Sequence, residues 1–176
     1  VERLATVFAT IGERASHLHG FLDGYARFAK LPAPRPQPVP WDPFLAALAA
    51  QHVFRRPERL PEAPGWFDPA QMEQALINLL KNAHEAGGPP DEVALDVVET
   101  AQGLRFEVTD RGPGMNEAVL AQALLPFYST KRSGTGLGLA LAREIAEAHG
   151  GRVALYNRRD GGLRGALSLP RTAPPA

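Results

Sequence analysis

Apolar residues recur at alternating spacings of four and three along residues 1–31, which predicts one long helix. The positions are Leu4, Phe8, Ile11, Ala15, Leu18, Leu22, Tyr25 and Ala29. This spacing keeps a single apolar stripe facing a partner helix. A lone helix cannot bury that stripe, so we expect a bundle with a further helix and a second protomer. Packing of the stripe against the helix's own domain is the alternative.

A proline-rich segment separates this helix from the rest of the chain. Proline stands at every second position from Pro32 to Pro40, which disfavours helices and sheet ladders and favours an extended, semi-rigid chain. We therefore expect a linker and a domain boundary here; a ligand for an SH3-like domain is the alternative. The expected parts are a helix over 1–31, the linker over 32–40, a globular domain over 41–171 and a C-terminal tail over 172–176.

Within the globular domain the pattern changes repeatedly between helical and strand periodicity. Asp42 and Asp68 each precede a proline, a pairing of N-cap and first-turn residues that predicts helix starts. The predicted helices cover 44–51, 69–86 and 138–149, and the predicted strands cover 92–99, 104–110, 152–157 and 163–169, with only weak strands between 52 and 66. This order predicts an α+β fold: a two-layer α/β sandwich with a mixed sheet covered by helices.

Composition narrows the classes of function. The formal net charge of +0 gives no broad field for nucleic acid or a membrane surface, so we expect contact with neither. The absence of cysteine excludes disulfides and thiolate metal sites. No apolar run reaches the roughly 18 residues that span a membrane. Because the chain begins at Val1, we expect a fragment of a longer protein. We expect this fragment to be cytoplasmic, with any membrane anchor upstream of it.

The helix over 69–86 carries a polar face beside its apolar one. The apolar face consists of Met72, Leu76, Leu79 and Ala83, and the polar face of Gln71, Asn78, Asn82 and Glu85. Such a polar stripe can be a plain solvated surface. An amide oxygen also suits Mg²⁺, a hard ion that takes few protein ligands and completes its shell with water and phosphates. Asn82 is therefore a candidate metal ligand.

Glycines follow a carboxylate at the end of the strand over 104–110. A carboxylate such as Asp110 at a strand tip accepts a hydrogen bond from the exocyclic amine of adenine, whereas guanine would present a carbonyl there. Gly112 and Gly114 let the backbone turn sharply and approach a base. Taken alone, an Asp-x-Gly sequence is more typical of an ordinary turn.

The glycine-rich segment 134–139 lies where a loop meets a predicted helix. Exposed N–H groups and the dipole at a helix start favour phosphate. A dinucleotide-binding Rossmann fold would need a strand directly before the glycines, but here a polar loop over 128–133 precedes them. That loop carries Lys131 and Arg132. It resembles an ATP lid, and this resemblance makes Lys131 the expected phosphate contact.

Together these motifs resemble the ATP-binding domain of bacterial sensor histidine kinases, in the superfamily of gyrase, Hsp90 and MutL ATPase domains. Residues 78–86 resemble the N box, 110–114 the G1 box, 126–131 the F box and 134–139 the G2 box. The resemblance implies a Bergerat-type ATP fold that transfers the γ-phosphate of Mg-ATP to a histidine on a separate helix, for relay to a response regulator protein. It also implies a homodimer through a helical hairpin, whose second helix the segment 1–31 resembles.

The resemblance assigns roles to individual residues. It implies catalytic roles for Asn78 and Lys131 and a Mg²⁺-binding role for Asn82. It implies nucleotide contacts for Asn78, Asn82, Asp110, Gly112, Gly114, Lys131, Thr135, Gly136, Leu137 and Gly138.

Several residues depart from one branch or another of this superfamily. Hydrolytic ATPases carry a glutamate where this chain has Asn78, and an amide has no basic lone pair with which to activate water. We therefore favour transfer, with a hydrolytic ATPase and a nucleotide-sensing module as alternatives. Glu85 and Ala86 replace a lysine and a tyrosine, as in the nitrogen-regulatory subgroup. Residues 162–165 lack the threonine and aromatic of the family's last strand.

The histidines are not expected to accept phosphate. The family's phosphoacceptor precedes an acidic residue, whereas His17 precedes Leu18 and His19 precedes Gly20. His149 is expected to mark a helix end. The phosphorylated residue is therefore expected outside this chain.

Overall fold

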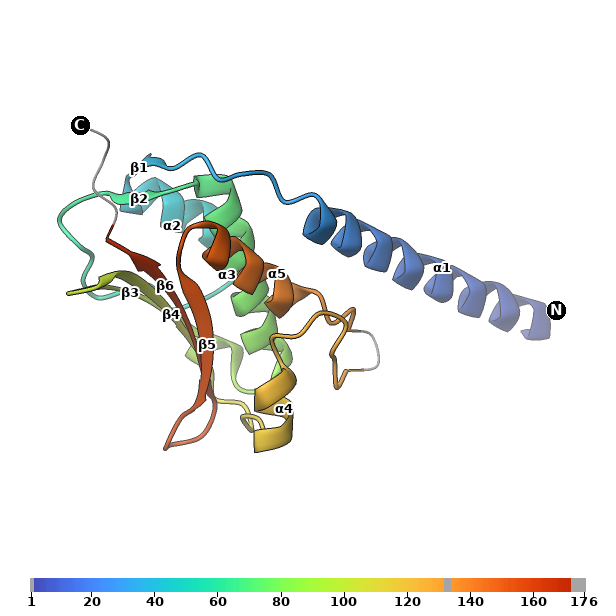
Figure 1. Cartoon of the computed structure of the whole chain (residues 1–176). Coiled ribbons are helices and arrows are strands. Elements are labelled where there is room, and N and C mark those ends of the chain that lie inside the picture. Colours follow the sequence, from blue (N-terminus) through green and yellow to red (C-terminus); the bar gives the residue numbers. More distant parts are fainter. Residues whose placement is uncertain (1, 132–133, 172–176) are drawn as a thin grey trace.

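The computed structural model describes residues 2–131 and 134–171 (Figure 1). Some side chains of the first helix, His17 among them, also lie outside the described part. The expected tail over 172–176 and Arg132 in the expected lid therefore fall outside the described residues.

The order of elements follows the predicted order, with additions. The helices are α1 (Glu2–Ala29), α2 (Trp41–Ala49), α3 (Pro69–Glu85), α4 (Glu117–Gln122) and α5 (Gly138–Ala148), with a 3₁₀ turn over Pro90–Glu92. The strands are β1 (Gln37–Val39), β2 (Gly65–Phe67), β3 (Ala94–Thr100), β4 (Gly103–Thr109), β5 (Arg152–Asn157) and β6 (Leu163–Pro170). The sequence did not predict α4, although Asn116 caps it in the usual way, with its side chain accepting from Val119 N at 2.9 Å.

The main sheet has the strand order β3-β4-β6-β5, and each of its ladders is antiparallel. Helices α3 and α5 lie against one face of this sheet (Figure 1). The two-layer α/β sandwich predicted from the sequence is confirmed. Within the described ranges, the parallel part of the expected mixed sheet is a single bridge between Arg55 and Ala94.

The core lies between the sheet and the helices. Met72, Leu76, Leu79 and Ala83 on α3 are all buried, as their spacing predicts. Aromatic rings from α2, β2 and β4 extend this core toward the linker: Phe67 packs edge-on against Phe106 with ring centroids 5.7 Å apart. The result is a rigid support for the polar face of α3.

The two predicted helix caps have different outcomes. Asp68 caps α3 as expected, because its Oδ1 accepts from Gln71 N at 3.1 Å and Pro69 follows at the first helical position. Burial by itself raises the pKa of Asp68, but backbone N–H groups of Arg35, Gln71 and Ala70 outweigh it and hold that pKa below its usual value. The expected cap at Asp42 is wrong: α2 begins at Trp41, whose buried ring packs in the core, so Asp42 lies in the first turn.

The proline-rich segment is docked onto the domain. The expectation that its prolines disfavour a sheet ladder is wrong for β1, which pairs antiparallel with β2. An edge strand tolerates proline, because one side of it needs no ladder bonds. Arg35 N donates to Asp68 Oδ2 at 2.9 Å, and Gln71 Nε2 donates to the carbonyl of Pro32 at 2.9 Å. The side chain of Gln71 therefore binds the linker, because Gln71 lies in the first turn of α3, where the linker packs.

Helix α1 extends outward from the sandwich (Figure 1). Its apolar stripe is open to solvent: Phe8 is 67% exposed and Ile11 56%. Near the C-terminal end of α1, Tyr25 stacks on Phe127 with ring centroids 6.4 Å apart. The helical bundle expected from the stripe stays a prediction. In the part of the chain described, none of the helices combines the length and apolarity needed to cross a membrane.

Candidate functional site

A cavity of about 560 Å³ opens between α3, the start of α5 and the loop that precedes it. Its lining comprises Gln74, Asn78, Lys81, Asn82 and Glu85 of α3, Met115, Val119 and Ala123 around α4, residues 128–131 and 134–139, Leu141 of α5, and Ser16 and Gly20 of α1. The polar face of α3 thus forms one wall, and the loop between α4 and α5 forms the wall opposite.

Asn78 and Asn82 of α3 line the same wall of the cavity because they are one helical turn apart. Asn78 Nδ2 is buried and has no hydrogen-bond partner among the described residues. Asn78 Oδ1 faces the start of α5, where a Cβ built on Gly138 would lie 3.5 Å away. A buried, unpaired donor in a cavity wall is costly unless a ligand accepts from it.

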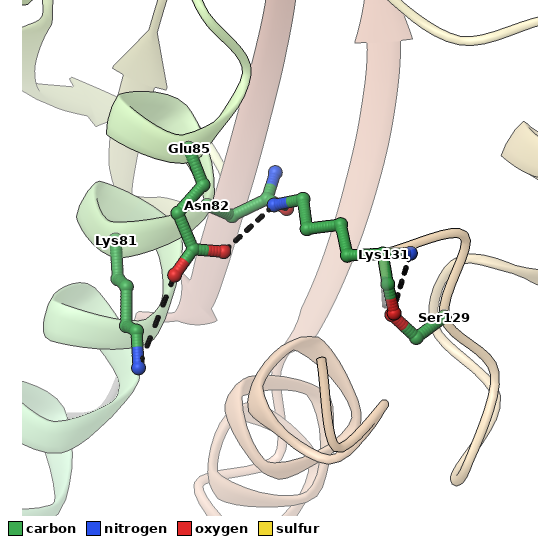
Figure 2. Close-up of polar contacts among 5 residues, drawn as sticks. All are labelled: Lys81, Asn82, Glu85, Ser129 and Lys131. Atoms are coloured by element: carbon green, nitrogen blue, oxygen red, sulfur yellow. Dashed lines mark hydrogen bonds and ion pairs between the residues drawn. The ribbon is translucent and has the colours of Figure 1, made fainter. Parts of the chain in front are cut away.

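The expected lid lysine reaches back across the cavity (Figure 2). Lys131 Nζ lies 2.8 Å from Glu85 Oε2 and 3.5 Å from Asn82 Oδ1. Ser129 Oγ accepts from Lys131 N at 3.1 Å and orders this part of the loop. The ammonium of Lys131 therefore bridges the loop before α5 and the polar face of α3, where Glu85 is its ion-pair partner.

The glycine-rich loop is shaped by a close approach between two parts of the lid. Gly136 has φ +69°, and a Cβ there would come within 2.5 Å of the Phe127 backbone. Phe127 N donates to Gly136 O at 2.9 Å, so the two segments are joined. Thr135 Oγ1 accepts from Leu137 N at 3.3 Å. No side chain among the described residues caps the start of α5, so the N–H groups of its first turn are available to an anion.

Asp110 is buried at the tip of β4, with 2% exposure. Its Oδ1 accepts from Gly112 N at 2.8 Å and from Leu163 N at 3.1 Å. Both bonds end on one oxygen, and no described residue donates to Oδ2, which leaves that oxygen for another donor. Gly112 packs on the end of α3, since a Cβ there would lie 2.8 Å from the Ala86 Cβ.

The structure brings together most, but not all, of the residues selected from the sequence. Those that line the cavity are Asn78, Asn82, Lys131, Thr135, Gly136, Leu137 and Gly138. Asp110, Gly112 and Gly114 do not line it; their loop adjoins it at Met115 and at the end of α3.

Other cavity residues were not predicted from the sequence. Gln74 and Lys81 lie one turn before and one turn after Asn78, so helical periodicity alone was sufficient to find them. Met115 had no such signal, because it lies in a loop whose path depends on distant strands.

The histidines whose side chains the structure describes lie outside the cavity lining. His149 ends α5: its Nδ1 lies 2.8 Å from Ile145 O, and its Nε2 accepts from Asp68 N at 3.2 Å. With Nε2 accepting, Nδ1 is the ring nitrogen that donates to Ile145 O, and both contacts fit a structural role. His19 is exposed on α1, and the side chain of His17 lies outside the described part.

The donors around the cavity fit Mg²⁺ bound together with a nucleotide. In the described part of the chain, no cluster of three or more His, Cys, Asp or Glu residues suits a metal ion. Mg²⁺ at a nucleotide site needs few protein ligands, because phosphates and water supply the rest. Asn82 Oδ1 already faces the Lys131 ammonium at 3.5 Å, so this oxygen lies in a position that favours a cation.

A family model described as histidine kinase-, DNA gyrase B- and HSP90-like ATPase matches residues 67–173. The sensor histidine kinase GtrS of Pseudomonas aeruginosa is 38% identical over 132 residues, which cover 74% of this chain and 26% of GtrS. The nitrogen regulation protein NtrY of Azorhizobium caulinodans is 31% identical, with coverage of 95% of this chain and 24% of NtrY. The chain thus spans about a quarter of the length of these relatives.

Solved structures have the same fold. Full-length ShkA in complex with AMPPNP matches 100% of this chain and 41% of its own, with 25% identity and a TM-score of 0.74. The histidine kinase ThkA in complex with the response regulator protein TrrA matches 96% of this chain and 52% of its own, with 21% identity and a TM-score of 0.76. The second likeness concerns the fold alone.

Proposed function

The chain belongs to the family of histidine kinase-, DNA gyrase B- and HSP90-like ATPases, and on that premise we propose that it is the Mg-ATP-binding catalytic module of a sensor histidine kinase. In this proposal it donates the γ-phosphate of ATP to a histidine on a separate helix. Positioning and charge neutralisation supply most of the rate in phosphoryl transfer, and a polar cavity beside a helix start is suited to both.

One observation carries the proposal: three groups surround the start of α5 in the cavity. They are the donor Asn78 Nδ2, the amide oxygen of Asn82, which is of the kind that binds Mg²⁺, and the ammonium of Lys131. Asn78 Nδ2 is buried there without a partner among the described residues, and a phosphate oxygen would satisfy it. We assign the metal to Asn82, where bound Mg²⁺ would neutralise phosphate charge. Lys131 would exchange Glu85 for a phosphate oxygen, and the backbone from Thr135 to Gly138 would bind phosphates through its N–H groups.

The base would be selected at the loop from Asp110 to Gly114. Because Asp110 Oδ1 is occupied by two backbone N–H groups, Oδ2 is the oxygen assigned to the exocyclic amine of adenine. Gly112 and Gly114 would let the backbone approach the base. The packing of Gly112 on Ala86 places this loop beside the polar end of α3, which supports the assignment.

Hydrolysis of ATP is the second candidate, and the wall of α3 argues against it. Asn78 stands where a general base would be needed, and an amide does not take a proton from water. Glu85 does not replace it as a base here, because its carboxylate is paired with Lys131 at 2.8 Å. A module that only senses nucleotide is the third candidate, and the presence together of Asn82, Asp110 and the glycine-rich segment argues against it.

The wider assembly is part of the proposal. ThkA forms a complex with the response regulator protein TrrA, and we propose a response regulator as the downstream partner of this chain as well. The exposed stripe of α1 suits a helical partner, which supports a homodimer through a hairpin in a longer protein. We propose a cytoplasmic site of action, where ATP is available.

The test uses labelled ATP, Mg²⁺ and this chain, with and without a separately supplied helical hairpin that carries the phosphoacceptor histidine. Acid-labile phosphate on the hairpin supports the kinase, and none is expected on His17 or His19. Free phosphate in excess of protein-bound label would support the ATPase. Binding without any transfer would support the sensing module.

A further inference from the structure

Asn157, at the end of β5, makes a pair of hydrogen bonds with one backbone residue far away in the sequence. Its Oδ1 accepts from Met115 N at 2.9 Å, and its Nδ2 donates to Met115 O at 2.6 Å. The side-chain amide thus bonds to both Met115 N and Met115 O, as the backbone of a paired strand would. Met115 follows directly after the glycine loop and lines the nucleotide cavity, so this pair fixes the point where that loop joins the cavity wall.

Gly114 makes room for this arrangement. Its φ is +74°, and a Cβ there would lie 2.6 Å from Asn157 Oδ1. A side chain at position 114 would therefore be strained and would also displace Asn157. In this chain the glycine serves the contact with Asn157 as well as the turn.

The same hairpin between β5 and β6 holds the other end of the loop. Arg158 Nη1 donates to Asp110 O at 2.6 Å. Asp110 N donates to Leu163 O at 3.0 Å, and Leu163 N returns a bond to Asp110 Oδ1 at 3.1 Å. The loop from Asp110 to Met115 is thus attached to residues 157–163 at its start and at its end.

We propose that Asn157 is a positioning residue for base selection, which acts by holding the loop from Asp110 to Met115 against the nucleotide. This inference rests on the proposed function. Asn157 is exposed and lies outside the buried hydrophobic core, so its loss removes no core packing. Its bonded partner is the loop of the site, and the effect of removing it is therefore expected in nucleotide discrimination more than in stability.

The experiment measures the affinities of Mg-ATP and Mg-GTP for the unaltered chain, Asn157→Ala, Asn157→Asp and the control Arg159→Ala. Arg159 is an exposed neighbour on the same turn. We expect Asn157→Ala to weaken ATP about fivefold to tenfold, as the loss of one to two hydrogen bonds implies. GTP should weaken less, so that the ratio of ATP to GTP affinity falls at least about threefold.

The aspartate variant separates the two bonds. It retains an acceptor for Met115 N but sets a carboxylate oxygen against Met115 O, so its loss should equal or exceed that of alanine. Arg159→Ala should behave as the unaltered chain does. An unchanged ratio in Asn157→Ala, a fall in melting temperature without a change in ratio, or normal ATP binding by Asn157→Asp would each overturn the inference. Failure of the unaltered chain to prefer ATP would instead refute the proposed function.

Discussion

Replacing Asp110 by asparagine exchanges one carboxylate oxygen for an NH₂ group and leaves the shape of the side chain unchanged. Oδ1 is needed by the fold, because it accepts from Gly112 N and from Leu163 N. The asparagine can keep an oxygen at that position. Its NH₂ group then replaces Oδ2, the oxygen that we assign to adenine, and it faces the base amine donor to donor.

The magnitude follows from the bond that is lost. A hydrogen bond to a charged group contributes about 1.5–3 kcal/mol, which corresponds to a roughly tenfold to 150-fold loss of ATP affinity. The fold should survive, since both backbone bonds retain an acceptor, although a neutral one. GTP should lose less or gain, because its carbonyl now meets a donor.

Isothermal titration of Mg-ATP and Mg-GTP, with thermal unfolding of each variant, checks this prediction. Asp160→Asn is the matched control, since Asp160 lies exposed on the turn before β6 and its substitution removes the same charge. ATP affinity of Asp110→Asn within about twofold of the unaltered chain would refute our assignment of Oδ2 to adenine. An equal loss in Asp160→Asn would show that charge alone is responsible.

Three further predictions concern the other groups of the site and the docked linker. Asn82→Ala should bind ATP normally without metal but lose the gain from Mg²⁺, so equal losses with and without Mg²⁺ would remove Asn82 from the metal site. Glu85→Gln should free Lys131 and tighten ATP about twofold to fivefold in the same titration, whereas weaker binding would show that Glu85 assists the nucleotide. Asp68→Ala should lower the free energy of unfolding by about 1 kcal/mol at neutral pH. Because the folded pKa of Asp68 is depressed, that difference should shrink as pH falls below 3.8, and a constant difference in urea titrations would contradict it.

Features governed by neighbouring residues were predictable from the sequence. Asp68 followed by Pro69 gave the start of α3, and the spacing along α3 gave its buried face and the wall that carries Asn78 and Asn82. The resemblance to histidine kinase domains is likewise confirmed by the family match. It was recognisable in the sequence because its motifs lie in short segments. The roles assigned to the single residues stay predictions.

Features set by distant partners were not predictable. The strand β1 forms only because Gly65–Phe67 comes alongside it, and nothing within 32–40 indicates that partner. Asn157 was missed for the same reason: its bonds go to Met115, 42 residues earlier in the chain. Lys131 was selected as a phosphate contact, but its pairing with Glu85 appears only when the loop folds over α3.

The attachment of the linker to α3 has a mechanical consequence. Pro32 and Arg35 are bonded to the first turn of the helix that carries Asn82 and Glu85 farther along. A helix rises about 1.5 Å per residue, so the docking point and Asn82 are joined by a stiff rod of roughly 20 Å. A displacement of the linker at Pro32 or Arg35 would therefore act directly on the helix that forms one wall of the cavity.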